Sequence, residues 1–464
     1  MHLTTKDRIG LLMVASTFGA LLLHNAPTGH RSTHVGPVAD AGGSVTSAVD
    51  VPTYAFVDVN VVPMDRDRVL HHQVVLVRDG FVTRIGDVGV VEPPAGARIV
   101  DGGGTRYLAP GLTDAHVHLG DEPRRLLELF VANGVTTVFN LEGTRDHLAL
   151  REAVRSGELT GPTIYTAGPF VDGRTVRSPA DARRTVHQQK QRGFDFVKVH
   201  GELSAPSFAA LSEAGATEHI AILGHAPRNL PFSAVLDNRQ AGVSHAEELI
   251  YTRFMSLDDT EIYEVAVDMV EAGTWLTPGI VNFRNIAAQW GAPEGLESAL
   301  ENRGAHFLPP SVRREWAAYE EYVEKDPAQR ARIADMLAFH EPLVRTLNEA
   351  GVPLLAGTDA PIPGIVPGFA LHEEIAALAD AGLTLYEALE TATSNPGRFV
   401  RAHVDPSANF GTVRVGARAD LVLLGSDPRE HLTALDRPEG VMVRGEYYDR
   451  AALDQMLTRL IASR

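Results

Sequence analysis

The 464-residue chain contains no cysteine. This absence excludes a disulfide scaffold, thiolate zinc sites, iron–sulfur clusters and a cysteine nucleophile. Lysine is nearly absent as well, because only four of the 42 basic residues are lysines: Lys6, Lys190, Lys198 and Lys325. Basic residues are outnumbered by 59 acidic ones, which gives a formal net charge of -17. An acidic surface repels phosphate backbones, so we expect a small-molecule substrate and no nucleic-acid partner.

Several catalytic signatures are missing too. The sequence has no G-x-S-x-G elbow, no P-loop and no dinucleotide fingerprint opening a βαβ unit. Apolar residues make up 44% and charged residues 22% of the chain, a balance that supports a packed core and excludes wholesale disorder. Any metal ion would have to be bound by His, Asp, Glu or a modified side chain, and 19 histidines are available.

The N-terminus begins with a charged stretch followed by an apolar run. Residues 9–23 are free of charge and follow Lys6, Asp7 and Arg8. This run is shorter than the roughly 20 residues that span a bilayer, and the pattern predicts a secretory signal. A retained anchor in contact with a membrane, a misassigned start and a buried helix are the alternatives. We therefore expect a secreted or cell-surface protein, cytoplasmic if the segment is not a signal, with residues 1–50 forming signal and linker.

Both ends of the remaining chain show the residue pattern of short β-strands. Residues 53–103 alternate apolar and polar side chains between turn signals, and residues 411–428 and 440–449 return to the same pattern. These runs predict a small antiparallel sheet at each end. We expect residues 51–105 and 401–464 to form one small β-sandwich together.

The middle of the chain, residues 106–400, alternates apolar runs with amphipathic stretches, several of which end in glycine as helices do. Eight strand–helix units predict an α/β fold, a (β/α)8 TIM barrel. An insertion at 283–340 would either cover the active-site mouth or form a surface helical excursion. The expected strands are 112–119, 135–141, 163–168, 194–201, 220–226, 242–248, 274–281 and 352–360.

Polar residues stand at the carboxyl ends of five of these predicted strands, where barrel enzymes place their chemistry. His116 and His118 are two residues apart on one strand and therefore face the same side. An isolated H-x-H is also common among core or surface histidines. Six such residues in order are strong evidence for a site: His116, His118, Lys198, His225, His245 and Asp359.

This pattern resembles the amidohydrolase superfamily, in its binuclear-metal branch. The matching stretches are PGLTDAHVHL, FDFVKVHG, ILGHAP, GVSHAEE and GTDA, and the likeness extends to GTVRVGARADLVLL and TSNPGRF. It covers nearly everything after residue 53. The chain is similar to Xaa-Pro and acyl-amino-acid dipeptidases and to ochratoxinase-type amidases.

The resemblance implies two divalent metal ions and a modified lysine. It implies that His116, His118 and Asp359 bind one ion and that His225 and His245 bind the other. Lys198 would be carboxylated by carbon dioxide and bridge the two ions. The chemistry is coherent, because burial favours the neutral amine that adds carbon dioxide, which an arginine cannot provide. The alternative is a partly buried lysine paired with Asp or Glu.

The donor set is all nitrogen and oxygen, which suits zinc, with manganese, cobalt, nickel or iron as alternatives. A hydroxide shared by the two ions would attack a carbonyl, and Asp359 would accept its proton and pass it to the leaving nitrogen. We expect hydrolysis of a linear amide, such as an N-acyl amino acid or a dipeptide with a free carboxylate. Hydrolysis of a cyclic amide or lactone is the alternative, and we expect a homo-oligomer.

Two further residues are candidate substrate contacts. His200 follows Lys198 by two residues, and it would contact substrate, replace the lysine in a mononuclear site, or pack. Arg228 stands where mononuclear deaminases of the superfamily have the acid of an H-x-x-E motif, which disfavours deamination. It would form a bidentate contact with a substrate carboxylate, or a surface salt bridge. Either Glu247 or Glu248 would orient a ligand histidine, and a non-catalytic binding protein is the remaining alternative.

Overall fold

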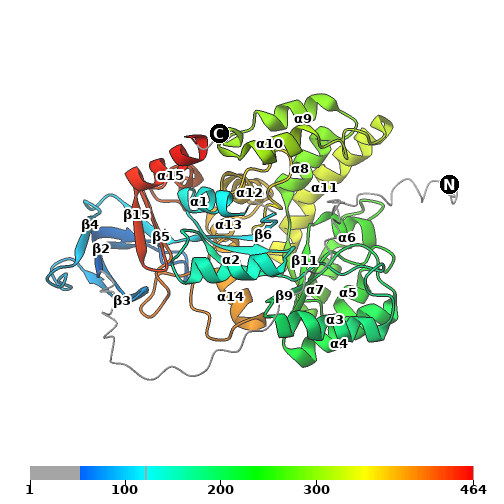
Figure 1. The fold of residues 1–464 in the computed structure, drawn as a ribbon, viewed down its shortest axis with the longest axis horizontal. Helices are drawn as coiled ribbons and strands as arrows, with labels where there is room; N and C mark the ends of the chain where they lie inside the picture. Colours follow the sequence, from blue (N-terminus) through cyan, green and yellow to red (C-terminus); the bar gives the residue numbers. More distant parts are fainter. Residues whose placement is uncertain (1–52, 121–122, 463–464) are drawn as a thin grey trace, which may run out of the picture. The chain divides into compact units, whose positions relative to one another are not determined.

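A computed structural model describes residues 53–120 and 123–462. The predicted signal and linker, residues 1–50, lies outside the described residues. Within the described ranges, none of the helices combines the length and apolar composition that crossing a bilayer requires. The fold is a mixed α/β arrangement with three sheets (Figure 1).

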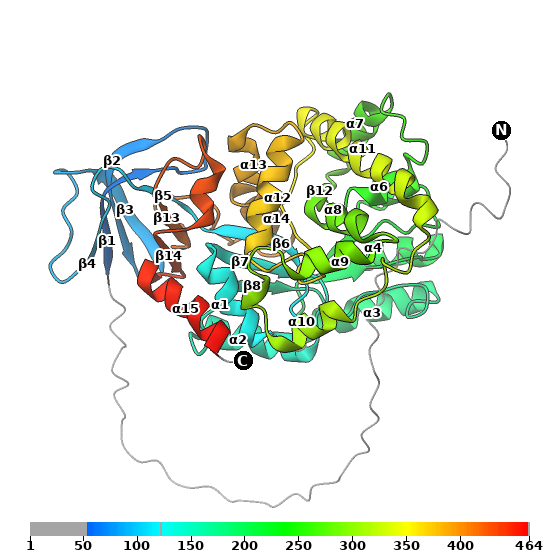
Figure 2. The same cartoon turned by 90° about the horizontal axis from the view of Figure 1, so that it is seen from above.

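The first sheet joins the two ends of the described chain, as predicted. Its strand order is β15-β14-β13-β5-β1-β2-β3, with β4 beside β1. The early and late strands meet where β5 pairs with β13, and Figure 2 shows them side by side. Their inner faces share one apolar core, which supports a β-sandwich-like domain. The strands are β1 (Tyr54–Val61), β2 (Leu70–Arg78), β3 (Phe81–Asp87), β4 (Arg98–Asp101), β5 (Tyr107–Pro110), β13 (Leu421–Leu424), β14 (Gly440–Val443) and β15 (Glu446–Asp449).

The prediction that the early strands form a purely antiparallel sheet is wrong. The pairs β1–β2 and β2–β3 are antiparallel, but β4 and β5 both run parallel to β1. The physical reason is the connection after β3, which carries the chain back to the start of β1 before β4 begins. A parallel neighbour requires such a return, whereas a tight hairpin produces an antiparallel one.

Two short parallel sheets lie in the middle of the chain. Their orders are β6-β7-β8 and β12-β11-β10-β9. Isolated parallel bridges connect them: Ala167 pairs with Phe196, Leu276 with Leu354, and Val117 with Ala360. A closed (β/α)8 barrel stays a prediction, which these bridges support. The strands are β6 (Leu112–Val117), β7 (Val135–Asn140), β8 (Thr163–Thr166), β9 (Phe196–Val199), β10 (Ala221–Gly224), β11 (Gly242–Ser244) and β12 (Trp275–Thr277).

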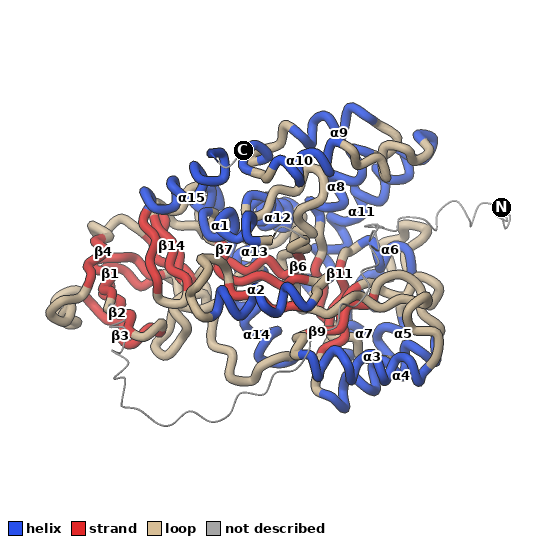
Figure 3. Tube along the Cα trace, viewed as in Figure 1, coloured by secondary structure: helices blue, strands red, loops and turns tan. Residues whose placement is uncertain are grey.

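Helices lie around these parallel strands (Figure 3). As predicted, α3 and α7 end at glycines in the left-handed region, Gly193 at φ 87° and Gly273 at φ 73°. The helices are α1 (Arg124–Ala132), α2 (Arg145–Arg155), α3 (Pro179–Arg192), α4 (Ala205–Glu218), α5 (Ser233–Asp237), α6 (Glu247–Thr252), α7 (Ile262–Ala272), α8 (Ile280–Gln289), α9 (Pro293–Leu300), α10 (Pro310–Ala317), α11 (Arg330–Glu349), α12 (Phe369–Asp380), α13 (Leu385–Thr391), α14 (Ser394–His403) and α15 (Arg450–Ala462).

The predicted strands of the middle region are all longer than the observed ones, and in three of them local backbone geometry explains the difference. The predicted strands 242–248 and 274–281 end at Ser244 and Thr277, because His245 and Gly279 adopt left-handed φ angles and the chain then turns into α6 and α8. Segment 352–360 has only isolated bridges. Pro353 has no N–H to donate, and Asp359 adopts φ 64°. These turns occur where candidate site residues stand.

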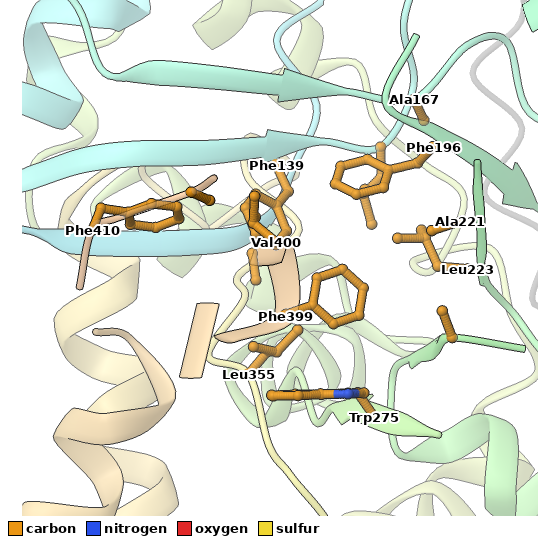
Figure 4. Packing of buried hydrophobic residues seen from close by; sticks show 14 residues of the cluster. Phe139, Ala167, Phe196, Ala221, Leu223, Trp275, Leu355, Phe399, Val400 and Phe410 are labelled. Atoms are coloured by element: carbon orange, nitrogen blue, oxygen red, sulfur yellow. The ribbon is translucent and has the colours of Figure 1, made fainter. Parts of the chain in front are cut away.

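Side chains from strands of both parallel sheets meet in one apolar interior. Phe139 of β7, Phe196 of β9 and Trp275 of β12 converge on Phe399 of α14 (Figure 4). Phe196 precedes Lys198 by two residues. Because strand side chains alternate, Lys198 faces the same interior one step nearer the carboxyl end. The apolar interior therefore forms the floor beneath the candidate site.

Candidate metal centre

The six residues predicted from strand ends come together in the structure. His116 lies in β6 and Lys198 in β9, while His225 and His245 directly follow β10 and β11. Asp359 belongs to segment 352–360, which is bridged to β6 next to His116. Parallel strands present their carboxyl ends at one edge, so the order of the motifs in sequence becomes proximity in space.

Asp359 directs its carboxylate at the H-x-H pair. Its Oδ1 lies 3.2 Å from His116 Nε2 and 2.9 Å from His118 Nε2. The two imidazole Nε2 atoms are only 3.3 Å apart. Burial raises the pKa of Asp359, but His116 and the other surrounding imidazoles outweigh it and hold that pKa well below its usual range. An ionised carboxylate and two imidazole nitrogens therefore point into one small space.

The imidazoles form a continuous row. Ring centroids are 5.3 Å apart for His116 and His118, 4.7 Å for His116 and His245, and 5.2 Å for His225 and His245. Burial lowers the pKa of both His116 and His225 well below the usual value. The neutral imidazole is the form that coordinates a metal ion, so these rings are prepared for coordination.

Lys198 is a buried amine whose hydrogen-bond partners are His116 and Ser244. It is 1% exposed, and its Nζ lies 3.3 Å from His116 Nε2 and 3.3 Å from Ser244 Oγ. Among the described residues, no carboxylate lies within ion-pairing distance of Nζ. Burial lowers the pKa of Lys198 to about 8, because removal from water disfavours the ammonium. The alternative of a lysine paired with Asp or Glu does not match this geometry.

The donor set fits a divalent metal. His116, His245 and Asp359 each offer one donor atom, and these atoms lie within 4.8 Å of one another. Imidazole nitrogen and carboxylate oxygen are donors that zinc accepts. This group takes one histidine from each of the two predicted ligand sets, so the structure arranges the candidate ligands around one shared space.

Contacts that the sequence did not predict tie the ligands together. Asp114 is buried and accepts hydrogen bonds from Thr358 N at 3.0 Å and from Thr358 Oγ1 at 2.7 Å. These bonds join β6 to the residue before Asp359. Glu142 Oε2 lies 3.2 Å from His118 Nδ1, the ring nitrogen that does not face Asp359. The position of Asp114, two residues before His116 on the same strand face, was the signal available in the sequence.

Asn282 makes a third contact that the sequence did not predict. It lies in the first turn of α8, is buried, and donates from Nδ2 to Asp359 Oδ2 at 2.9 Å. Buried Glu374 holds that turn by accepting from the backbone N–H of Ile280 and Val281. The two oxygens of Asp359 are thus divided, with Oδ1 facing His116 and His118 and Oδ2 held by Asn282.

We predict that Asn282→Ala lowers kcat by about 10–100-fold while KM changes little, because the amide fixes the carboxylate of Asp359. Steady-state kinetics on metal-loaded protein measure both constants. Asn285→Ala is the matched control, since Asn285 lies one turn along α8 and bonds to Val281 O. Equal kcat for wild type and Asn282→Ala would remove Asn282 from the site.

The two candidate substrate contacts have protein partners. The His200 ring packs between Phe170 and His225, with centroids 4.6 Å and 4.4 Å away, and burial lowers its pKa to about 3. Arg228 forms an ion pair with Glu248, a fully buried carboxylate rather than a surface one. A role in substrate binding stays a prediction for both residues.

The 283–340 insertion is mostly helical and contacts the loop that follows Asp359. Trp316 Nε1 donates to Pro361 O at 3.0 Å, and Gln289 Nε2 donates to Pro363 O at 3.1 Å. The pKa of Tyr319 is raised by burial, by Glu321 and also by the charge of Asp359. The insertion therefore contacts the loop beside the candidate metal centre, while a cover over its mouth and a surface helical excursion both stay predictions.

The chain belongs to the Amidohydrolase family, which residues 107–447 match. An uncharacterized protein of Mycobacterium tuberculosis (strain ATCC 25618 / H37Rv) is 25% identical over 377 residues, covering 77% of this chain and 89% of the relative. The structure of bottromycin amidohydrolase is 26% identical, with a TM-score of 0.67, covering 89% of this chain and 90% of that one. Family membership makes this chain an enzyme acting on carbon–nitrogen bonds, a hydrolase of amides.

The predicted likeness to dipeptidases and ochratoxinase is confirmed. A Xaa-Pro dipeptidase with bound methionine has a TM-score of 0.64 at 18% identity, covering 86% of this chain and 100% of that one. The A. niger ochratoxinase has a TM-score of 0.62 at 18% identity, covering 86% and 96%. At this identity the likeness shows a shared fold.

Proposed function

We propose that this protein is a binuclear metal-dependent hydrolase that cleaves a linear amide, an N-acyl amino acid or a dipeptide-like substrate. The observation that carries the proposal is the buried Lys198 amine, which lies beside His116 and feels the charge of Asp359. Among the residues that the structure describes, no carboxylate lies within ion-pairing distance of this amine. A closed (β/α)8 barrel would present these residues at one mouth, and the bridges between the two parallel sheets support it.

The neutral amine of Lys198 would add to carbon dioxide, forming a nitrogen–carbon bond and releasing one proton. The resulting carbamate is an anion in a buried place, so it needs cations beside it. His116, His118 and Asp359 would hold one ion, His225 and His245 the other, and the Lys198 carbamate both. Two divalent ions, zinc by the chemistry of the donors, supply Lewis-acid polarisation of the amide carbonyl and lower the pKa of a water molecule.

Asp359 would move the proton. Its carboxylate is ionised, and it would accept a proton from the attacking water and deliver it to the leaving nitrogen, so that an amine and a carboxylate are the products. Asn282 keeps the carboxylate in one orientation during both transfers. Replacing Asp359 therefore removes a proton carrier as well as a ligand.

The choice of a linear amide has two supports. The names of structural relatives include an amidohydrolase and a Xaa-Pro dipeptidase, and deamination is disfavoured because Arg228 stands at the position of the H-x-x-E acid. Cyclic amides and lactones are the second candidate class, since the same attack would open a ring.

A substrate panel tests the proposal. We expect zinc-loaded protein to hydrolyse N-acyl amino acids or dipeptides, with turnover lost after chelation and regained with zinc. Lactones and cyclic ureas form the comparison arm, and newly released primary amine is the readout for the linear substrates. Turnover limited to the ring substrates would overturn the linear-amide proposal while leaving the metal site in place.

A further inference from the structure

The carboxylate of Glu248 lies between a proposed metal ligand and an arginine. Its Oε1 is 3.4 Å from His225 Nδ1 and 2.5 Å from Nη2 of Arg228. Nε of Arg228 adds contacts of 3.1 Å and 3.2 Å to the two oxygens of Glu248. Because Glu248 is 0% exposed, both partners meet it away from water, where charge-assisted contacts are strongest.

Arg228 is itself held in place. Its guanidinium carbon lies 4.5 Å from the ring centroid of Tyr251, which is on α6 with Glu248. Its side chain keeps 14% exposure. The planar fork of arginine engages both oxygens of one carboxylate, which the point charge of lysine does not reproduce. Glu248 is therefore fixed in orientation from the side opposite His225.

We infer that Arg228 and Glu248 are positioning residues for metal binding, an inference that rests on the proposed function. Arg228 fixes Glu248, and Glu248 accepts the Nδ1–H of His225, which leaves Nε2 of His225 free as the donor to the metal ion. A carboxylate behind a ligand histidine sets the orientation of its ring and strengthens it as a ligand. Glu248 belongs to α6, the helix after the next strand, and Arg228 holds its carboxylate beside His225.

If Arg228 positions Glu248, its replacement affects different constants than if Arg228 binds a substrate carboxylate. A positioning residue changes metal affinity and, through it, kcat. A residue that only binds the substrate changes KM and leaves metal affinity unaltered.

The test is calorimetric titration of the metal-free full-length chain with zinc, combined with steady-state kinetics. The variants are Glu248→Gln, Arg228→Lys and Arg228→Met. We expect each to weaken the binding of one zinc ion by about 10–100-fold. The accompanying fall in kcat is recovered at excess zinc, and KM stays at the wild-type value. Arg151→Met is the matched control, because Arg151 pairs with Asp195 at the opposite end of β9 from Lys198.

Wild-type zinc affinity in Glu248→Gln would overturn the inference, as would a rise in KM alone in Arg228→Met. If circular dichroism shows that Arg228→Met does not fold, Glu248→Gln and Arg228→Lys decide, because both retain polar partners. Absence of zinc binding in the wild type would overturn the proposed function and this inference with it. Zinc binding in the wild type that is unchanged in Glu248→Gln would overturn the inference alone.

Discussion

Lys198→Ala is expected to lose at least about 10²–10³-fold in kcat and to bind less metal, because it removes the anion proposed to bridge both ions. Short-chain carboxylic acids such as acetate or propionate should restore part of the activity, since they place a carboxylate in the space left by the lysine. The measurements are kcat and metal content per chain, with and without the added acid.

The matched control for that experiment is Lys190→Ala. Lys190 lies on α3, and its amine donates to His219 O at an exposed position, so its loss should leave both readouts unchanged. A Lys198→Ala protein with wild-type kcat and wild-type metal content would show that the bridge assignment is wrong. Loss of activity without any rescue, at full metal content, would contradict the carboxylate role.

Asp359→Asn is expected to lower kcat by about 10²–10⁴-fold, the contribution of a positioned general acid and base. The amide of asparagine keeps an oxygen near His116 and His118 but cannot accept a proton. KM should change much less than kcat, because the carboxylate acts on the reacting atoms and not on the body of the substrate. Steady-state kinetics at saturating zinc separate the two constants.

The control here is Asp335→Asn, a substitution at an exposed position on α11 within the insertion. It tests whether removing one negative charge near the covering helices is enough to change the rate. If Asp359→Asn turned over at the wild-type rate, Asp359 would be a ligand at most, and the proton would have to be carried by another group.

The sequence predicted the site residues that lie on strands better than those that reach the site from helices. His116, Lys198, His225 and His245 stand at strand ends, and the alternation of side chains along a strand placed them on one side. Asn282 reaches Asp359 from α8, and Glu248, one of the two glutamates expected to orient a ligand histidine, reaches His225 from α6. Which side chain each of them contacts depends on how α8 and α6 pack, which no local pattern encodes. Arg228 shows the same limit, because its partner lies 20 residues away.

For the fold, the sequence likewise predicted local features and missed those that depend on tertiary structure. Apolar runs located the strands of both parallel sheets, but not where the strands end, because His245 and Gly279 turn the chain inside those runs. The joining of the two chain ends in one sheet was predicted from the alternating apolar and polar pattern that they share. The parallel course of β4 and β5 did not, because it depends on the path of the connection after β3. Helix α15 was not predicted, because residues 401–464 were assigned to the second part of the sandwich.

The proposed Lys198 carbamate is tested by loading the metal-free protein with zinc and isotopically labelled bicarbonate. The measurements are then metal content per chain and the carbon NMR signal of a carbamate. We predict about two zinc ions per chain and one carbamate signal that is missing in Lys198→Ala. Protein that takes up zinc under these conditions while the Lys198 amine remains unmodified would contradict the bridging role of the Lys198 carbamate.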